Sequence, residues 1–396
     1  MKFIIEKIVP LLVSGILVFL LFYKTDVLQK KKTLKNTEIG TSFHFSNYKQ
    51  PEALPTIISA LKLKNTILLI GSSELSTIPT DLNARADLFF QNYKTNLSLV
   101  SLGHAGNQSM SIYSQLLALH NYIYMSKISI IISPGWFTNG YQEGTSLASF
   151  LEFNNEAFLS EILKNQNDTF KLYISNYIYN HYNDINTPSN IHKLFIDYNN
   201  RISNPIKSVF EYPLYLFHDF IHDKISDSLI YKYNTLDTDK IKYSKTNKSI
   251  IINWNCIEDI AIKQHNNNST NNTWSINNDY FKNYINGELF HQTVQSPSKI
   301  NELTDLKMLL YLLNYYNVDA SFIIQPLNPY AYDNLQDLKP VITYIKNEIE
   351  KYNYPYYDMF VYDTLKYEKG TLTDIMHFGE YGWFKVDKFL IDTYEK

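Results

Sequence analysis

The chain has 396 residues, 45% of them hydrophobic, which is enough to bury a core in two domains or in one large elaborated domain. Its net charge of −3, with both signs dispersed along the chain, argues against a nucleic-acid-binding protein, so no nucleic-acid partner is expected. Cys256 is the only cysteine, which excludes an intramolecular disulfide and a cluster of thiolate metal ligands.

The N-terminal segment contains an uncharged apolar run, Ile8–Tyr23, between Lys7 and Lys24. Its sixteen residues fall a little short of the roughly 20 that cross a bilayer, but flanking lysines can extend to the headgroups. No small-residue cleavage site follows, so an uncleaved single-pass anchor over residues 1–35 is favoured over a signal peptide. More lysines follow the run than precede it, which taken alone would place the rest of the chain in the cytoplasm.

Residues 36–63 are polar and contain two prolines, so we expect a linker there, followed by one domain over residues 64–396. From residue 66 onward, short apolar runs alternate with helical spacing, a pattern typical of βαβ units and a parallel sheet. Strands are expected at Thr66–Ile70, Asn96–Leu102, Ile128–Ile132, Ala320–Gln325 and Tyr356–Tyr362. Helices are expected from Ser73 and at Gln108–Met125, Glu302–Tyr316, Asp333–Lys351 and Tyr381–Tyr394. The predicted fold class is α/β with a central parallel sheet.

From about residue 141 to 300 this alternation is weaker. Helices are expected at Phe150–Leu163 and Lys207–Ile225, and Asn266–Asn278 is a polar, low-complexity loop. A stretch of this length between sheet elements predicts an insertion that covers the functional site.

The first strand stops at Gly71 and is followed by Ser72, Ser73 and Glu74. Glycine allows the sharp turn from a strand into a helix, and a serine there lies at the carboxyl end of a parallel strand, where open α/β sheets bind ligands. The nearby helix N-terminus favours developing negative charge. Ser73 is therefore a candidate nucleophile. The alternative, that both serines only cap the helix, is the one that this stretch taken alone favours.

Near the C-terminus, Asp374 and His377 are three residues apart, so both side chains can face the same way. His377 would act as a general base, and Asp374 would fix its tautomer and stabilise the imidazolium. A surface pair is the simpler interpretation of this spacing. Its position after the last expected strand favours the catalytic one, because Ser73 is expected at the same sheet edge.

Acyl transfer to a serine also requires N–H donors for the oxyanion. Gly106 follows the second expected strand, and the amides of Ser73 and Gly106 are candidate donors, with the side chains of Asn107 and Gln108. Trp136 follows the third expected strand and is a candidate substrate contact, although aromatic residues beside a turn also serve packing.

These motifs resemble the SGNH-hydrolase fold and, more narrowly, the DltD family of membrane-anchored proteins of the D-alanyl-lipoteichoic acid pathway. Five blocks carry the resemblance: G-S-S-E-L at Gly71–Leu75, G-x-x-G-N-Q-S at Gly103–Ser109, S-P-x-W-F at Ser133–Phe137, Q-P-x-N-P at Gln325–Pro329 and D-x-M-H-x-G-x-x-G-W at Asp374–Trp383. The resemblance implies a three-layer SGNH-hydrolase-like fold, Ser73 as nucleophile, Asp374 and His377 as its partners, and Gly106 as the oxyanion glycine.

The resemblance also implies a function: D-alanyl transfer to teichoic or lipoteichoic acid at the outer membrane face, with the catalytic domain extracellular. The implied partners are a membrane-bound O-acyltransferase of the same pathway, a carrier-protein or lipid-linked D-alanyl donor, and the teichoic acid polymer. Gly135 departs from the family pattern, which usually has glutamine there, so the third oxyanion donor stays open. Two alternatives stay open as well: a carbohydrate O-acetyltransferase or esterase of the same fold, and a non-catalytic adaptor that binds carrier protein or polymer.

No cofactor is expected. The chain has no P-loop lysine motif and no strand-linked G-x-G-x-x-G, so a nucleotide role lacks support. His218 and His222 have the four-residue spacing of metal ligands, but the sequence supplies no obvious third ligand.

Overall fold

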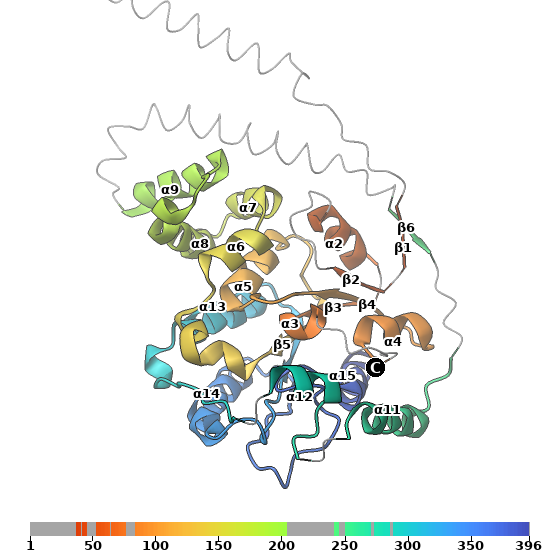
Figure 1. The fold of residues 1–396 in the computed structure, drawn as a ribbon. Helices are drawn as coiled ribbons and strands as arrows, with labels where there is room; N and C mark the ends of the chain where they lie inside the picture. The colour runs from red at the N-terminus through yellow and green to blue at the C-terminus, as the bar shows by residue number, and fades with distance from the viewer. Residues whose placement is uncertain are drawn as a thin grey trace, which may run out of the picture.

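The computed structural model describes residues 37–40, 42–45, 53–63, 65–76, 84–203, 241–244, 250–270, 273–285 and 288–395. Within these residues a six-stranded sheet with the strand order β2-β4-β3-β5-β7-β8 forms the centre, and all neighbouring strands are parallel (Figure 1). Its strands are β2 (Phe43–Phe45), β3 (Thr66–Ile70), β4 (Ser98–Leu102), β5 (Lys127–Ile132), β7 (Asp319–Ile324) and β8 (Tyr356–Asp358). The short strands β1 (Thr37–Gly40) and β6 (Ile241–Ser244) form a separate parallel pair. The predicted α/β class with a central parallel sheet is confirmed.

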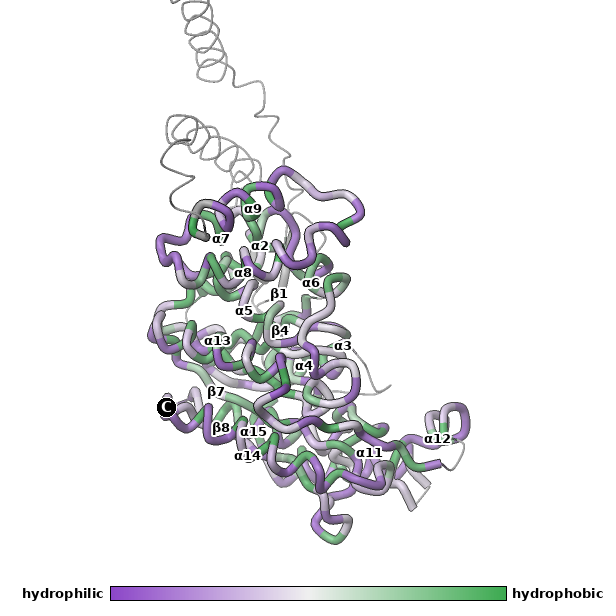
Figure 2. Tube along the Cα trace, turned by 90° about the vertical axis from the view of Figure 1, so that its left-hand side faces the viewer, coloured by the Kyte–Doolittle hydropathy of each residue, from purple (hydrophilic) through white to green (hydrophobic). Residues whose placement is uncertain are grey.

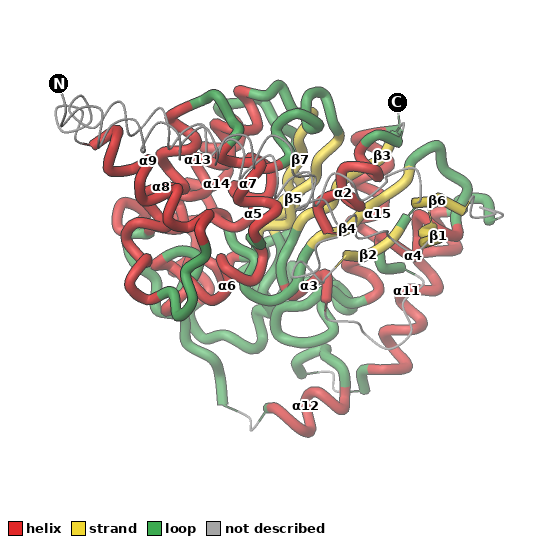
Figure 3. The backbone as a smooth tube through the Cα atoms, turned by 90° about the horizontal axis from the view of Figure 1, so that it is seen from above, coloured by secondary structure: helices red, strands yellow, loops and turns green. Residues whose placement is uncertain are grey.

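Helices cover both faces of the sheet (Figure 3), because successive side chains of each strand enter different apolar cores. In β3, Leu68 and Ile70 belong to one core, and Ile67 and Leu69 belong to the other. Helices that pack into the first core are α2 (Ala53–Leu61), α5 (Ser109–Ala118), α6 (Leu147–Phe153), α7 (Glu156–Leu163), α8 (Asp168–His181), α9 (Asn190–Ser203), α13 (Asn301–Tyr315) and α14 (Lys339–Glu350). Helices α4 (Ala86–Asn92), α11 (Trp254–Asn268) and α15 (Glu380–Tyr394) pack into the second.

Several expected elements differ from the observed ones in their bounds. The segment 36–63, expected as a linker, contains β2, which extends the sheet beside β4, and α2, whose Ala53 and Ile57 are fully buried. The single helix expected at Phe150–Leu163 is two helices, α6 and α7, because the Asn155 side chain accepts hydrogen bonds from two amides of the next turn and starts a new helix. The helix expected at 207–225 lies outside the described residues. The division into anchor, linker and domain stays a prediction.

The order of the strands determines where a ligand can bind. From β3 the chain moves to β4 on one side of it and then to β5 on its other side. At such a reversal the loops leaving the carboxyl ends of the strands diverge and open a crevice. The loops that begin at Gly71 and at Ser133 flank this position.

The predicted membrane localisation is corrected by the structure. The expected anchor, Ile8–Tyr23, lies outside the described residues, and over the residues that are described, no helix combines the length and apolarity needed to cross a membrane. The longest of these helices, among them α13 and α15, have 15 residues, which rise only about 22 Å against a hydrocarbon core of about 30 Å. Hydrophobic and hydrophilic positions also alternate along them (Figure 2). The predicted single-pass anchor with an extracellular catalytic domain is therefore not retained.

Candidate active site

The turn after β3 brings Ser73 to the edge of the sheet. The Gly71 amide continues the strand pairing by donating to the Leu102 carbonyl at 3.0 Å, and the short helix α3 (Ser73–Ser76) begins two residues later. The loop after β4 packs directly against this turn: a Cβ on Gly103 would lie 2.3 Å from the Gly71 carbonyl oxygen, so only glycine fits there. Two neighbouring loops thus meet at the start of α3.

Ser73, His377 and Asp374 form a continuous hydrogen-bonded chain. Ser73 Oγ lies 2.9 Å from His377 Nε2, and His377 Nδ1 lies 2.7 Å from Asp374 Oδ2. Because the carboxylate can only accept, Nδ1 carries the donated proton, and in the neutral imidazole Nε2 is left to accept from the Ser73 hydroxyl. This arrangement holds a hydroxyl, an imidazole base and an orienting carboxylate in the order required for nucleophilic catalysis.

The loop that carries His377 is fixed by its own hydrogen bonds. Asp374 Oδ1 accepts from the Met376 amide at 2.8 Å and from the His377 amide at 2.7 Å, so the carboxylate is locked by the turn it closes. The loop after β7 also holds this turn in place. The Gln325 side-chain amide donates to the Met376 carbonyl, and the Asn328 backbone amide donates to the Ile375 carbonyl at 2.9 Å.

Glu74, a buried carboxylic acid that follows Ser73 in the chain, contributes to the electrostatics of the site. Glu74 is 1% exposed and accepts a 2.6 Å hydrogen bond from the Ser72 amide. Burial raises the pKa of Glu74 to about 7, and its hydrogen bonds and His377 limit the rise. Burial by itself would lower the pKa of His377, but the hydrogen bond and charge of Asp374, with a smaller contribution from Glu74, raise that pKa above 6.5. Sequence reasoning gave Glu74 no role, because only its burial reveals one.

A cavity of about 170 Å³ opens at Ser73. Its walls come from the loops after β3, β4, β5, β7 and β8 and from the segment before α13. The lining residues are Ser72, Ser73, Ala105, Gly106, Gln108, Ser133, Gly135, Trp136, Thr138, Asn139, Tyr141, Gln292, Leu327, Tyr332 and Met376. No charged side chain is among these residues. A single water needs only about 10–15 Å³ on this measure, so the space is large enough for a small acyl group.

Some of the residues proposed to bind the oxyanion line the cavity, and Asn107 does not. Gly106 lines the cavity with a φ of +90°, a backbone conformation that favours glycine. Gln108 also lines it, and its Nε2 donates to the Tyr141 carbonyl at 3.0 Å. Asn107 does not: it is fully buried, and its Nδ2 donates to the Gly71 carbonyl at 2.9 Å, which ties the loops after β3 and β4 together.

Two further residues that were discussed from the sequence, one tryptophan and one glycine, also border the cavity. Trp136, 6% exposed, forms part of its wall, as does Gly135. A Cβ on Gly135 would meet only Ser133 Oγ, at 3.4 Å, so a side chain is sterically tolerated there.

Sequence reasoning missed Gln292 and Tyr332, which face the same cavity as Ser73. Gln292 comes from the end of the insertion and follows no strand, so no local pattern marks it. Within the described part of the chain, no group of three or more His, Cys, Asp or Glu residues is placed to hold a metal ion. His218 and His222 lie outside that part.

Comparison with known proteins places the chain in a family. No curated protein matches it. The family model described as DltD protein matches residues 55–395, a range that includes most of α2, five of the six sheet strands and every residue of the site described above. Because this match covers nearly the whole sequence, the chain belongs to the DltD family, and this membership links it to the D-alanylation of teichoic acids.

Proposed function

We propose that this chain is a serine-dependent O-acyltransferase that transfers D-alanyl groups during the D-alanylation of teichoic acids. The observation that carries the proposal is the hydrogen-bonded chain from Ser73 Oγ through the His377 imidazole to Asp374. Family membership supports the acyl group and the polymer, and the cavity beside Ser73 supports a small acyl substituent.

In the first half-reaction, His377 Nε2 takes the hydroxyl proton of Ser73 as Oγ attacks the carbonyl carbon of a D-alanyl ester or thioester. A C–O bond forms, and the bond to the donor's alcohol or thiol breaks when that leaving group receives the proton from His377. The product is D-alanyl-Ser73. Asp374 stabilises the imidazolium throughout and stays ionised.

In the second half-reaction, a hydroxyl of the polymer gives its proton to His377 and attacks the D-alanyl carbonyl. Ser73 leaves with the proton, and the D-alanyl ester is now on the polymer. Each tetrahedral intermediate carries an oxyanion, for which we propose the amides of Ser73 and Gly106 as donors, with the Gln108 side chain. The amide of Ser73 is suited to this, because the first N–H groups of a helix have no intrahelical acceptor.

The proposal extends to the donor and to a partner. The donor would be a carrier protein or a lipid that holds D-alanine by a thioester or ester bond, and the transfer would be shared with a membrane-bound O-acyltransferase of the pathway. The family's place in a pathway with other Dlt proteins supports both.

Ser73→Ala tests the proposal, and Ser72→Ala is its matched control. Ser72 is the adjacent serine, and its Oγ contacts the His104 carbonyl rather than the imidazole. We expect a fluorophosphonate to label the wild type and Ser72→Ala but not Ser73→Ala, and D-alanine release from a D-alanyl ester to follow the same pattern. Equal labelling of all three proteins, with no ester turnover in any of them, would favour the adaptor alternative. Ester turnover that survives Ser73→Ala would exclude Ser73 as the nucleophile.

One observation keeps the O-acetyl alternative open. The cavity lining contains no carboxylate to meet the ammonium group of D-alanine, so an uncharged acetyl group also fits. Comparing D-alanyl and acetyl esters of the same alcohol decides between the two. A kcat/KM that favours the acetyl ester would replace D-alanyl transfer with O-acetyl chemistry on the same serine.

A further inference from the structure

A short extended segment closes one side of the cavity. We call residues 289–295, which precede α13, the strap. Its backbone pairs with the loop after β7: the Phe290 amide donates to the Ala331 carbonyl at 2.8 Å, and the Asp333 amide donates to the Phe290 carbonyl at 3.1 Å. The insertion is thus fastened to the sheet edge beside Tyr332.

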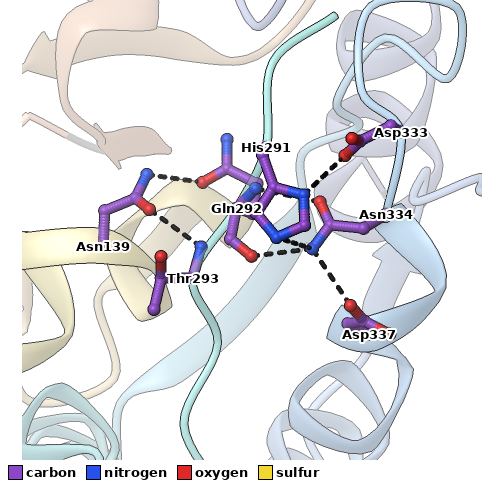
Figure 4. Close-up of polar contacts among 7 residues, drawn as sticks. All are labelled: Asn139, His291, Gln292, Thr293, Asp333, Asn334 and Asp337. Atoms are coloured by element: carbon purple, nitrogen blue, oxygen red, sulfur yellow. Dashed lines mark hydrogen bonds and ion pairs between the residues drawn. The ribbon is translucent and has the colours of Figure 1, made fainter.

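Two asparagines hold the strap from opposite sides (Figure 4). Asn334 donates from Nδ2 to the Gln292 carbonyl at 2.7 Å and accepts from the Gln292 amide at 2.9 Å. Asn139 belongs to the loop after β5. Its side-chain Oδ1 accepts from the Thr293 backbone amide at 2.9 Å, and its backbone amide donates to the Thr293 carbonyl at 2.8 Å. Paired bonds of this kind fix the strap's position and its rotation about the chain axis.

The Gln292 side chain is directed by the same network. It is 7% exposed and lines the cavity with Ser73. Its Oε1 accepts from Asn139 Nδ2 at 2.8 Å, and the opposite end of its amide faces Tyr332, which also lines the cavity. A carbonyl oxygen has two lone pairs, so Oε1 retains one acceptor site. Burial raises the pKa of Tyr332, against the effect of the Gln292 hydrogen bond, so its hydroxyl stays neutral at physiological pH.

The proposed function gives this acceptor a use. A D-alanyl group attached to Ser73 carries an α-ammonium with three donors, and no charged residue is among those that line the cavity. Neutral acceptors and aromatic faces are the alternative partners of a buried ammonium. Gln292 Oε1, the Tyr332 hydroxyl and the Trp136 ring are such groups, and Gln292 is the one whose position is fixed from both sides.

Resting on the proposed function, we propose that Gln292 is a substrate-binding residue that accepts a hydrogen bond from the α-ammonium of the acyl group. It therefore sets the preference for an aminoacyl group over an acyl group of the same shape without the amine. The strap is the device that brings this residue of the insertion to the catalytic serine.

The test uses two isosteric substitutions and a matched pair on the same strap. Gln292→Glu keeps the oxygen that Asn139 contacts and adds a negative charge, and Gln292→Met removes both polar atoms at nearly the same volume. Gln295→Glu and Gln295→Met are the controls, because Gln295 is not a cavity-lining residue and its side chain contacts Glu143. Binding of D-alaninamide and of propionamide is measured by NMR titration of the full chain carrying Ser73→Ala, so that the readout needs no turnover.

We expect the preference for D-alaninamide over propionamide to rise about ten-fold or more in Gln292→Glu, because opposite charges at close range attract strongly in a partly buried site. We expect it to fall about ten-fold in Gln292→Met, because a hydrogen bond to a charged group is lost. The Gln295 variants should leave it unchanged. A preference that stays within two-fold of the parent in both Gln292 variants, or that moves equally in the Gln295 variants, overturns the inference.

Failure of the proposed function has a different signature. Turnover of D-alanyl esters would then be independent of Ser73, whatever the binding preference shows. Conversely, Ser73-dependent turnover combined with an unchanged preference in the Gln292 variants removes this inference and leaves the proposed function intact.

Discussion

His377 Nε2 lies 2.9 Å from Ser73 Oγ, although 304 positions separate the two residues in the chain. The parallel sheet explains this proximity, because the carboxyl ends of all its strands lie at one edge, and both residues follow strands of that sheet. The proximity depends on the whole domain folding, so the site should be lost cooperatively with the fold.

Asp374, whose carboxylate orients the His377 imidazole, should contribute strongly to kcat. We expect Asp374→Asn to lower kcat for D-alanyl ester turnover by about 10⁴-fold, because an amide donor favours the wrong imidazole tautomer. Asp363→Asn is the control, since Asp363 also accepts an amide hydrogen bond from two residues downstream but has no contact with His377. Near-normal kcat in Asp374→Asn would show that His377 does not work as a general base.

The pH dependence follows from the raised pKa of His377. Only the neutral imidazole can accept the Ser73 proton, so kcat/KM should rise with pH along a limb centred above the ordinary value of about 6.5. Glu74 contributes to raising this pKa, so Glu74→Gln should move the limb to lower pH while it leaves the alkaline plateau in place. The variant keeps an oxygen for the Ser72 amide, and unchanged circular dichroism serves as the control. A limb that moves to higher pH would contradict the assigned role of Glu74.

Gly106 combines a backbone constraint with a steric one. Its φ is +90°, and a Cβ there would lie 2.4 Å from Ser149 Oγ. We expect Gly106→Ala to lower the free energy of unfolding by about 1–3 kcal/mol and to lower ester turnover, because the amide proposed for the oxyanion is displaced. The double variant Gly106→Ala/Ser149→Ala should recover part of the stability, since it removes the clash but not the strain. Full recovery would mean that the backbone is unstrained.

Asp387 should make stability decrease with rising pH. It is fully buried on α15, neither carboxylate oxygen has a partner among the described residues, and burial, with the nearby Asp87, raises its pKa well above 3.8. The folded state then holds a proton that the unfolded state releases above its own lower pKa. From pH about 4 up to the folded pKa, this one group should remove about 1.4 kcal/mol of stability per pH unit.

Asp387→Asn abolishes this titration. We expect its unfolding free energy, measured by urea denaturation, to gain on the wild type as pH rises from about 5 to 8, with the smallest advantage at the acid end. Asp392→Asn, on the same helix, is the control. A constant difference between variant and wild type across this range would show that Asp387 is ionised in the folded protein.

Local sequence determined the central part of the fold. The strand expected at Thr66–Ile70 is β3 with the same bounds, and the helices expected at Glu302–Tyr316 and Tyr381–Tyr394 match α13 and α15 to within one residue at each end. These predictions succeed because a fully buried strand is a short continuous apolar run, and an amphipathic helix repeats its apolar residues every three to four positions. The same patterns singled out Ser73 and the Asp374–His377 pair, because each follows the end of a strand.

Only the tertiary structure decided what distant residues do together. The polar segment expected as a linker supplies an edge strand and a core helix, Asn107 ties two loops together away from the cavity, and burial alone raises the pKa of Glu74 to about 7. Gln292 reaches the cavity because Asn139 and Asn334, from two other loops, hold the strap in place. Burial and long-range hydrogen bonds are properties of the packed chain, and no window of neighbouring residues contains them.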